Sequence, residues 1–169
     1  VQKDTLSKIM EHQIRAINEV VTVHNGRCLV ALPPGTGKTL IGCLCIAHYI
    51  TTNALVCCPA SKVADWKSEI KQWIGRDNVK VCSFDCLSRD EESKSTKWDV
   101  IIVDESHNLK NDCARTVSLK QMMLNAKALI LLSGTPQASA PSELYNQLNL
   151  IRPDLFHKRE TFVERYMEV

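Results

Sequence analysis

The sequence predicts an α/β fold with a mostly parallel central sheet and helices on both faces. Short runs of consecutive apolar residues, typical of strands buried on both faces, alternate with segments whose apolar residues have helical spacing. Helices between successive strands supply the crossover connections that parallel pairing needs. A chain of 169 residues is long enough to bury a core, and we expect one domain over residues 1–169.

The first half of the chain alternates helices and strands. Apolar residues at helical spacing predict the first helix, which His24-Asn25-Gly26 ends. The first strand runs into Pro33-Pro34-Gly35, and a helix follows. Later in this half, Trp66 and Trp73 repeat at helical spacing with Ile70, so we expect core packing. The predicted elements are helix 6–21, strand 27–32, helix 38–50, strand 54–58, helix 62–73 and strand 79–83.

The second half continues the alternation after a polar interruption. Residues 85–97 are polar and are expected to form a loop. Two all-apolar runs beyond them predict strands 100–103 and 128–132. A helix is expected between these strands at 115–124, and another at 142–150.

Composition excludes several classes of protein. Hydrophobic residues make up 44% of the chain and charged residues 24%, a balance unlike that of disordered chains. No apolar run approaches the ~20 residues that span a bilayer, and no basic-then-apolar leader opens the sequence. We therefore expect an intracellular protein without a membrane partner, and no oligomer. The net charge of +2 is too small to indicate nucleic-acid binding by itself.

The eight cysteines include no Cys-x-x-Cys pair and lie mostly in or beside apolar stretches. Buried reduced thiols are the interpretation we favour, which fits a reducing compartment. The thiols expected in the core are Cys28, Cys43, Cys45, Cys57 and Cys58. A zinc site from Cys82, Cys86 and His107 is an alternative, although its spacing matches no familiar ligand pattern.

A glycine-rich segment lies between the first strand and the next helix, where phosphate-binding loops occur. Its glycines allow backbone N–H groups to approach phosphate oxygens, and the helix N-terminus adds positive potential. We expect Lys38 to reach the β- and γ-phosphates of ATP and Thr39 to ligate Mg²⁺. A glycine turn with a solvated lysine is the alternative, and Leu32 stands where the strict pattern has glycine. The predicted nucleotide-binding residues are Pro34, Gly35, Thr36, Gly37, Lys38 and Thr39.

Two carboxylates, Asp104 and Glu105, follow directly on the strand predicted at 100–103. They should lie at the carboxyl end of the sheet beside the glycine loop. We expect Asp104 to hold magnesium through its water shell and Glu105 to position the attacking water. An acidic loop after a strand is common, so the pair alone is weak evidence for a catalytic site. The phosphate-binding loop beside it makes the evidence strong. Lys38, Asp104 and Glu105 are the predicted catalytic residues.

The last predicted strand ends in Leu132-Ser133-Gly134-Thr135-Pro136, which brings hydroxyl groups to the same sheet edge. A simple Ser/Gly/Pro turn is one interpretation. The position of the segment after the acidic strand favours another, in which it couples nucleotide state to movement.

In these motifs the chain resembles the Swi2/Snf2 group of superfamily 2 helicase-like ATPases. It is most similar to the annealing-helicase branch, which rewinds DNA at stalled forks. The Asp-Glu-Ser-His box and the Ser-Gly-Thr-Pro segment with its Glu-Leu-Tyr continuation are the most specific matches. The matching stretches are His12-Gln13, Gly35 to Thr39, Cys58-Pro59-Ala60-Ser61 with Trp66, Asp104 to His107 with Leu109-Lys110-Asn111, and Leu132 to Pro136 with Glu143-Leu144-Tyr145.

The resemblance implies the first RecA-like P-loop lobe of a DNA-dependent ATPase, which uses ATP and Mg²⁺ to translocate on, remodel or anneal duplex DNA. Gln13 would read the adenine edge, for which its amide has the paired donor and acceptor. His107, Ser133 and Thr135 would couple the nucleotide site to movement. Sequence-independent DNA-backbone contacts are implied at Ser61, Lys62, Ser83, Phe84, Lys110 and Asn111, with solvated loops as the alternative.

The resemblance also implies a second RecA-like lobe, whose arginines reach the γ-phosphate across a cleft. No counterpart of that lobe is recognised in residues 1–169, so we expect these residues alone to bind nucleotide and hydrolyse it slowly. The localisation implied is nuclear in a eukaryote and cytoplasmic otherwise.

Two alternative functions stay open from the sequence. Leu32-Pro33-Pro34-Gly35 is similar to AAA+ ATPases, although that class normally has a polar residue, often Asn, where Ser133-Gly134-Thr135-Pro136 stands here. The other alternative is a non-catalytic lobe that binds DNA or protein and has a vestigial nucleotide site. The intact Lys38, Thr39, Asp104 and Glu105 favour an enzyme.

Overall fold

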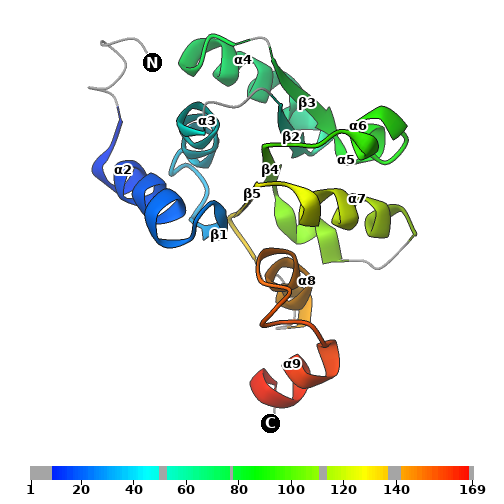
Figure 1. Ribbon diagram of the computed structural model, residues 1–169. Helices are drawn as coiled ribbons and strands as arrows, with labels where there is room; N and C mark the ends of the chain where they lie inside the picture. Colours follow the sequence, from blue (N-terminus) through cyan, green and yellow to red (C-terminus); the bar gives the residue numbers. More distant parts are fainter. Residues whose placement is uncertain (1–8, 50–52, 77, 111–113, 137–141, 168–169) are drawn as a thin grey trace.

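The computed structural model describes residues 9–49, 53–76, 78–110, 114–136 and 142–167 (Figure 1). The first expected helix therefore begins outside the described residues, at 6–8. The elements are α2 (Glu11–Asn18), the π-helical turn η1 (Glu19–Val23), β1 (Arg27–Ala31), α3 (Lys38–His48), β2 (Ala54–Cys58), η2 (Ala60–Lys62), α4 (Val63–Trp73), β3 (Val79–Ser83), α5 (Phe84–Leu87), α6 (Glu91–Ser95), β4 (Val100–Asp104), η3 (Ser106–Lys110), α7 (Ala114–Asn125), β5 (Ala128–Ser133), α8 (Ser142–Ile151) and α9 (Arg159–Tyr166).

The strands form one five-stranded sheet in the order β1-β5-β4-β2-β3, and every pair is parallel. This confirms the predicted α/β class. Because the strands are parallel, their carboxyl ends meet at one edge of the sheet. At that edge β5 lies between β1 and β4, with Ala31 paired to Ser133 and Asp104 paired to Leu132.

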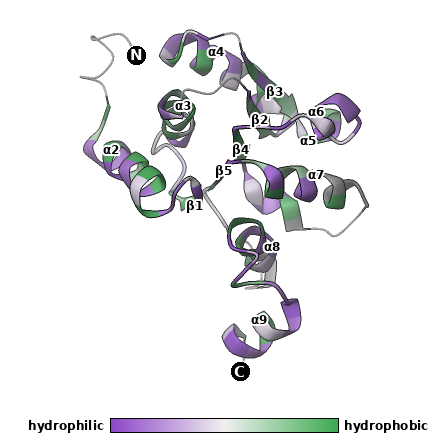
Figure 2. Cartoon of the chain, in the orientation of Figure 1, coloured by the Kyte–Doolittle hydropathy of each residue, from purple (hydrophilic) through white to green (hydrophobic). Residues whose placement is uncertain are grey.

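Two apolar layers cover the two faces of the sheet, as the continuously apolar strands predict. In Figure 2 the buried helix α3 is coloured mainly hydrophobic, whereas α9 is mainly hydrophilic. The layer under η1, α3 and α4 includes Val20, Ile41, Ile46, Trp66, Ile70, Val56, Ile102 and Ile130. The layer under α5, α7 and α8 includes Leu87, Leu119, Met122, Met123, Leu150, Leu55, Ile101 and Leu129. Trp66 is fully buried and Trp73 packs at the margin of the same layer, which confirms the prediction for both.

The loop predicted at 85–97 is wrong, because this segment contains α5 and α6. Ser83 begins α5 by accepting a hydrogen bond from the Cys86 N–H, and Asp90 begins α6 in the same way from Ser93. Trp98 then donates its indole N–H to the Ser93 carbonyl at 2.9 Å. Capping hydrogen bonds and the contact of one buried tryptophan thus stabilise these short helices. They lack the apolar periodicity by which longer helices are recognised in a sequence.

Helix α9 is absent from the sequence prediction. It lies beyond α8, away from the sheet (Figure 1). Only Phe162 of its residues is buried, and its ring packs against those of Tyr145 and Phe156. These aromatic contacts of a single buried residue hold the helix in place of the apolar stripe that would have indicated a helix in the sequence.

The five core cysteines expected from the sequence are all buried and free. Burial raises the pKa of the Cys28, Cys43 and Cys45 thiols to about 12. Within the described residues, no three His, Cys, Asp or Glu side chains are grouped to hold a metal, so Cys82, Cys86 and His107 form no such site. Across the same ranges, no helix combines the length and apolar character needed to span a membrane.

Arg27, at the start of β1, joins the C-terminal ends of α7 and α8. Its guanidinium donates hydrogen bonds to the carbonyls of Ala126 and Leu150 at 2.8 Å, and of Met123 and Ile151 at 3.4 Å. A cation at two helix C-termini satisfies carbonyls that have no partner within their helices. Burial lowers the pKa of Arg27 from its usual value, and this pairing keeps the charge tolerable in a partly buried position.

Replacing this guanidinium should destabilise the fold. We expect Arg27→Met to lower the free energy of unfolding by about 2–4 kcal/mol, because several buried carbonyls lose a charged donor. Arg15→Met is the matched control: Arg15 is exposed and, among the described residues, forms an ion pair with Glu19 alone, so its loss should cost less than about 0.5 kcal/mol. Urea denaturation of both variants measures the difference. Equal stability of the two would contradict the role assigned to Arg27.

Candidate nucleotide-binding site

The glycine loop connects β1 to α3 and depends on left-handed backbone at two positions. Gly35 has a φ of +80° and Gly37 a φ of +79°, which residues with a Cβ rarely adopt. At Gly37 a Cβ would also lie 2.2 Å from Nε2 of Gln13, so a larger residue there would require the Gln13 side chain to shift. Around Gly35 the space is open, and its glycine is required by conformation alone.

The side chain of Lys38 organises this loop. Its ammonium donates to the carbonyl oxygen of Leu32 at 2.8 Å and of Pro33 at 3.1 Å. The Thr36 hydroxyl donates to the same Pro33 carbonyl at 2.8 Å. The carbonyl groups of Leu32 and Pro33 thus point toward the Lys38 ammonium. Leu32, which replaces the usual glycine, contributes its backbone carbonyl to this arrangement.

Gln13 ties α2 to the glycine loop. It is buried, and its Oε1 accepts the Met10 N–H at 3.0 Å while its Nε2 donates to the Thr36 carbonyl at 3.1 Å. The neighbouring His12 ring nitrogen Nε2 lies 3.0 Å from the same carbonyl. Gln13 therefore supports the loop directly, and its contact with adenine stays a prediction.

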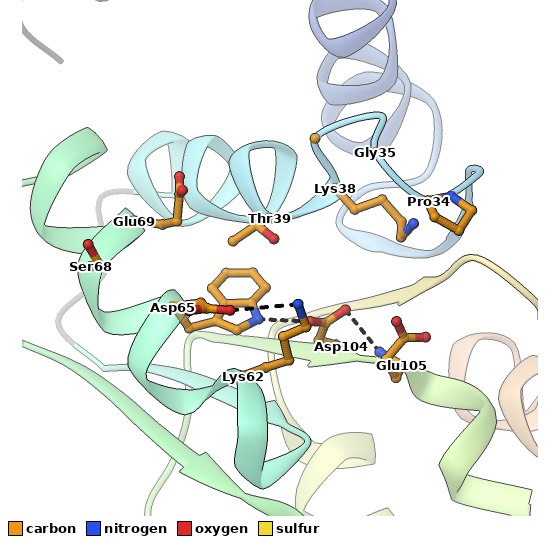
Figure 3. A pocket seen from close by; sticks show the side chains of 12 residues that line it. Pro34, Gly35, Lys38, Thr39, Lys62, Asp65, Ser68, Glu69, Asp104 and Glu105 are labelled. Atoms are coloured by element: carbon orange, nitrogen blue, oxygen red, sulfur yellow. Dashed lines mark hydrogen bonds and ion pairs between the residues drawn. The ribbon is translucent and has the colours of Figure 1, made fainter.

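A cavity of about 510 Å³ lies beside the loop, at the carboxyl edge of the sheet (Figure 3). The described residues that line it come from the loop, the start of α3, α4 and the end of β4. They are Pro34, Gly35, Gly37, Lys38, Thr39, Lys62, Asp65, Trp66, Ser68, Glu69, Asp104 and Glu105. All three predicted catalytic residues and the predicted magnesium ligand Thr39 thus face one space.

The two acids of the cavity have different environments. Asp104 is buried, and its Oδ1 accepts the N–H of Glu105 at 3.0 Å while its Oδ2 accepts the Trp66 indole N–H at 2.9 Å. Glu105 is partly exposed and has a φ of +50°, a conformation that costs a residue with a Cβ of the order of 1 kcal/mol. Strained backbone of this kind concentrates at functional sites.

A polar chain connects Glu105 to the end of β5. Nδ1 of His107 lies 3.4 Å from a Glu105 carboxylate oxygen and 3.1 Å from the Ser133 hydroxyl. The hydroxyl in turn accepts the Thr135 N–H at 3.1 Å. The three residues predicted to couple nucleotide state to movement are therefore linked to the acid pair by successive contacts.

A second, parallel link was missed from the sequence. The buried Ser106 hydroxyl donates to Oε1 of Gln147 at 2.6 Å, and the Gln147 amide donates to the Pro136 carbonyl at 2.7 Å. Gln147 belongs to α8. Its side chain joins Ser106, in the Asp-Glu-Ser-His segment after β4, to Pro136, in the segment after β5. A lone glutamine in a helical stretch carries no sequence signal for such a role.

Comparison with known proteins identifies the family to which this site belongs. The family model described as SNF2-related domain matches residues 12–91 and 77–168. The chain belongs to this family. Its similarity to AAA+ ATPases around Pro33 and Pro34 is thereby confined to the loop, and the AAA+ alternative is wrong.

Relatives of this SNF2 domain are much longer proteins. The regulator of chromatin "SWI/SNF-related matrix-associated actin-dependent regulator of chromatin subfamily A-like protein 1" of Xenopus tropicalis is 34% identical over 183 residues, which cover 96% of this chain and 19% of that protein. The "DNA annealing helicase and endonuclease ZRANB3" of Mus musculus is 31% identical over 170 residues, 84% of this chain and 16% of the relative. The chain thus spans about a fifth or less of their length.

A solved structure shares the fold of this SNF2 domain. The Sulfolobus solfataricus SWI2/SNF2 ATPase core in complex with dsDNA superimposes with a TM-score of 0.79 at 22% identity, covering 92% of this chain and 38% of that one. The RecA-like fold predicted for the chain is confirmed.

The residues predicted to contact DNA differ in their surroundings. Ser61 is exposed after β2, whereas Lys62 lines the nucleotide cavity and pairs with Asp65 at 3.6 Å. The Ser83 hydroxyl is used to begin α5, and Phe84 packs against the core under that helix. The side chain of Lys110, and Asn111, lie outside the described residues. DNA contact stays a prediction for all of these positions.

The strained backbone of Glu105 predicts an unusual stability effect. Glu105→Gly should unfold with a free energy about 1 kcal/mol higher than Glu105→Ala, because glycine adopts positive φ without steric cost. Both variants lack the carboxylate, so their difference isolates the backbone term. Thermal and urea denaturation measure it, and an Ala variant as stable as the Gly variant would show that Glu105 is unstrained.

Proposed function

We propose that this SNF2 domain is the ATP-binding lobe of a DNA-dependent ATPase that translocates on, remodels or anneals duplex DNA. One observation carries the proposal: Lys38, Thr39, Asp104 and Glu105, from two separate strand ends, line a single cavity. That combination supplies the cation, the metal ligands and the water-positioning carboxylate that phosphoryl transfer needs.

Each of these side chains has a distinct task. When nucleotide binds, Lys38 exchanges the carbonyl oxygens of Leu32 and Pro33 for phosphate oxygens. Its ammonium therefore has hydrogen-bond acceptors with and without nucleotide. The Thr39 hydroxyl and the Asp104 carboxylate are oxygen donors, which fit magnesium. Magnesium held there neutralises negative charge on the phosphates. Glu105, beside Asp104 and partly exposed, orients the attacking water.

Duplex DNA is proposed as the partner on the carboxyl edge of the sheet. The solved SWI2/SNF2 core with the same fold is in complex with dsDNA. In this chain, the exposed Ser61 follows β2 at that edge, and phosphate contacts of such residues are independent of sequence. The similarity to a protein named as a DNA annealing helicase supports annealing as one of the proposed activities.

Fast hydrolysis requires further groups. Among the described residues that line the cavity, the only cations are Lys38 and Lys62, and none is an arginine. We therefore assign the arginines that reach the γ-phosphate to a second RecA-like lobe. Residues 1–169 alone then bind nucleotide and hydrolyse it slowly. The eukaryotic relatives named as regulators of chromatin favour a nuclear location in a eukaryote.

ATP hydrolysis by the full-length protein, with and without duplex DNA, tests the function. We expect DNA to stimulate hydrolysis, Lys38→Ala to abolish nucleotide binding, and Glu105→Gln to retain binding while kcat falls at least 100-fold. If DNA-dependent function survives in Lys38→Ala, the chain is instead a non-catalytic binding lobe with a vestigial nucleotide site.

The contact of His107 with Ser133 predicts a coupling effect. His107→Ala and Ser133→Ala should each reduce the stimulation of hydrolysis by DNA several-fold without changing nucleotide affinity. The double variant should be no worse than either single variant, because either change interrupts the chain of contacts from Glu105 through His107 to Ser133. Ser95→Ala, an exposed serine on α6, is the matched control and should leave stimulation unchanged. Fully additive losses would argue against coupling through this contact.

A further inference from the structure

The indole of Trp66 is aimed at the carboxylate of Asp104. Trp66 lies on α4 and is 1% exposed, and its Nε1–H donates to Oδ2 of Asp104 at 2.9 Å. Asp104 is 7% exposed at the end of β4, so this hydrogen bond joins two buried groups that are 38 positions apart in the chain. Hydrogen bonds to an ionised acceptor in such surroundings are strong and directional.

This bond completes the fixation of the carboxylate. Oδ1 accepts the N–H of Glu105, and Oδ2 accepts the indole N–H of Trp66. Each oxygen therefore has one protein donor, and the two donors together define the plane of the group. Asp104 lines the same cavity as Thr39.

The position of the indole is itself fixed by packing. A Cβ at Gly42 of α3 would lie 2.7 Å from the six-membered ring of Trp66, so the indole sits directly against the helix backbone. Trp66 also belongs to the apolar layer that contains Ile70 and Ile102. Because the ring packs against α3 and the apolar layer on the sheet, the direction of the indole N–H is fixed, and with it the direction of the hydrogen bond to Asp104.

We propose that Trp66 is a positioning residue, whose indole N–H holds the Asp104 carboxylate in the orientation that binds the magnesium of a nucleotide complex. This inference rests on the proposed function, because it concerns the same metal. Groups that orient a metal-binding carboxylate contribute about 10- to 100-fold to metal affinity. Trp66 also lines the cavity, but its N–H is donated to Asp104, and its proposed role runs through that carboxylate.

The chain contains a matched control in the apolar layer on the other face of the sheet. Trp98 is also buried, and its indole N–H donates to the Ser93 carbonyl at 2.9 Å. Trp66→Phe and Trp98→Phe each replace a buried indole by a phenyl ring and remove one N–H hydrogen bond. Neither Trp98 nor Ser93 is among the described residues that line the nucleotide cavity, so only the first change affects Asp104.

The test is a titration of the full-length protein with Mn²⁺, a substitute for Mg²⁺, in the presence of ADP. Free Mn²⁺ is measured by electron paramagnetic resonance, which does not depend on turnover. Binding of a fluorescent ADP analogue without metal is measured alongside. In Trp66→Phe we expect Mn²⁺ affinity to fall about tenfold, with metal-free nucleotide affinity within about twofold of wild type. Trp98→Phe should match wild type in both measurements.

Two results would overturn the positioning role: unchanged Mn²⁺ affinity in Trp66→Phe, or an equal loss of metal-free nucleotide binding, which would indicate general structural damage. If Trp66→Phe does not fold, the same titration is made on Gly42→Ala, which displaces the ring without removing its N–H. Unchanged Mn²⁺ affinity in that variant would also overturn the positioning role. Failure of wild type to bind Mn²⁺ with ADP would instead refute the proposed function.

Discussion

Parallel pairing of β1, β5 and β4 is the constraint on which the site depends. It brings three strand ends to one edge, so that the phosphate loop after β1 and the acids after β4 flank the hydroxyl segment after β5. Gly134 illustrates how close the segments lie: a Cβ there would be 3.4 Å from Pro34 and 3.5 Å from the Lys38 ammonium. A strand order that moved β1 away from β4 would separate the lysine from the carboxylates.

Buried polar contacts then convert this proximity into a defined geometry. Gln13 holds the loop through Thr36, and Trp66 holds Asp104 from the opposite side. Polar groups in such positions are costly when unpaired, so each contact favours a single arrangement. His107 extends the same principle from the acids to β5, which gives the nucleotide site a physical connection to the rest of the sheet edge.

The parts of this structure that sequence predicts are those encoded locally. Apolar runs specify the strands, and the glycine loop and acid pair are recognised because each follows directly on a strand. Residues 85–97 escape this logic, since Ser83 and Asp90 form short helices by capping. The role of Trp66 escapes it too: helical spacing predicts burial correctly, but the partner of its N–H lies on another element. A buried indole usually needs such a partner, but the sequence does not say which group supplies it.

The most direct test of the central claim is a crystal structure of the full-length protein with Mg²⁺, ADP and beryllium fluoride. The account predicts phosphate oxygens and beryllium fluoride at the Lys38 ammonium, with the metal on the side of the cavity shared by Thr39 and Asp104. Nucleotide bound at another surface, or bound here with the metal remote from Asp104, would contradict it.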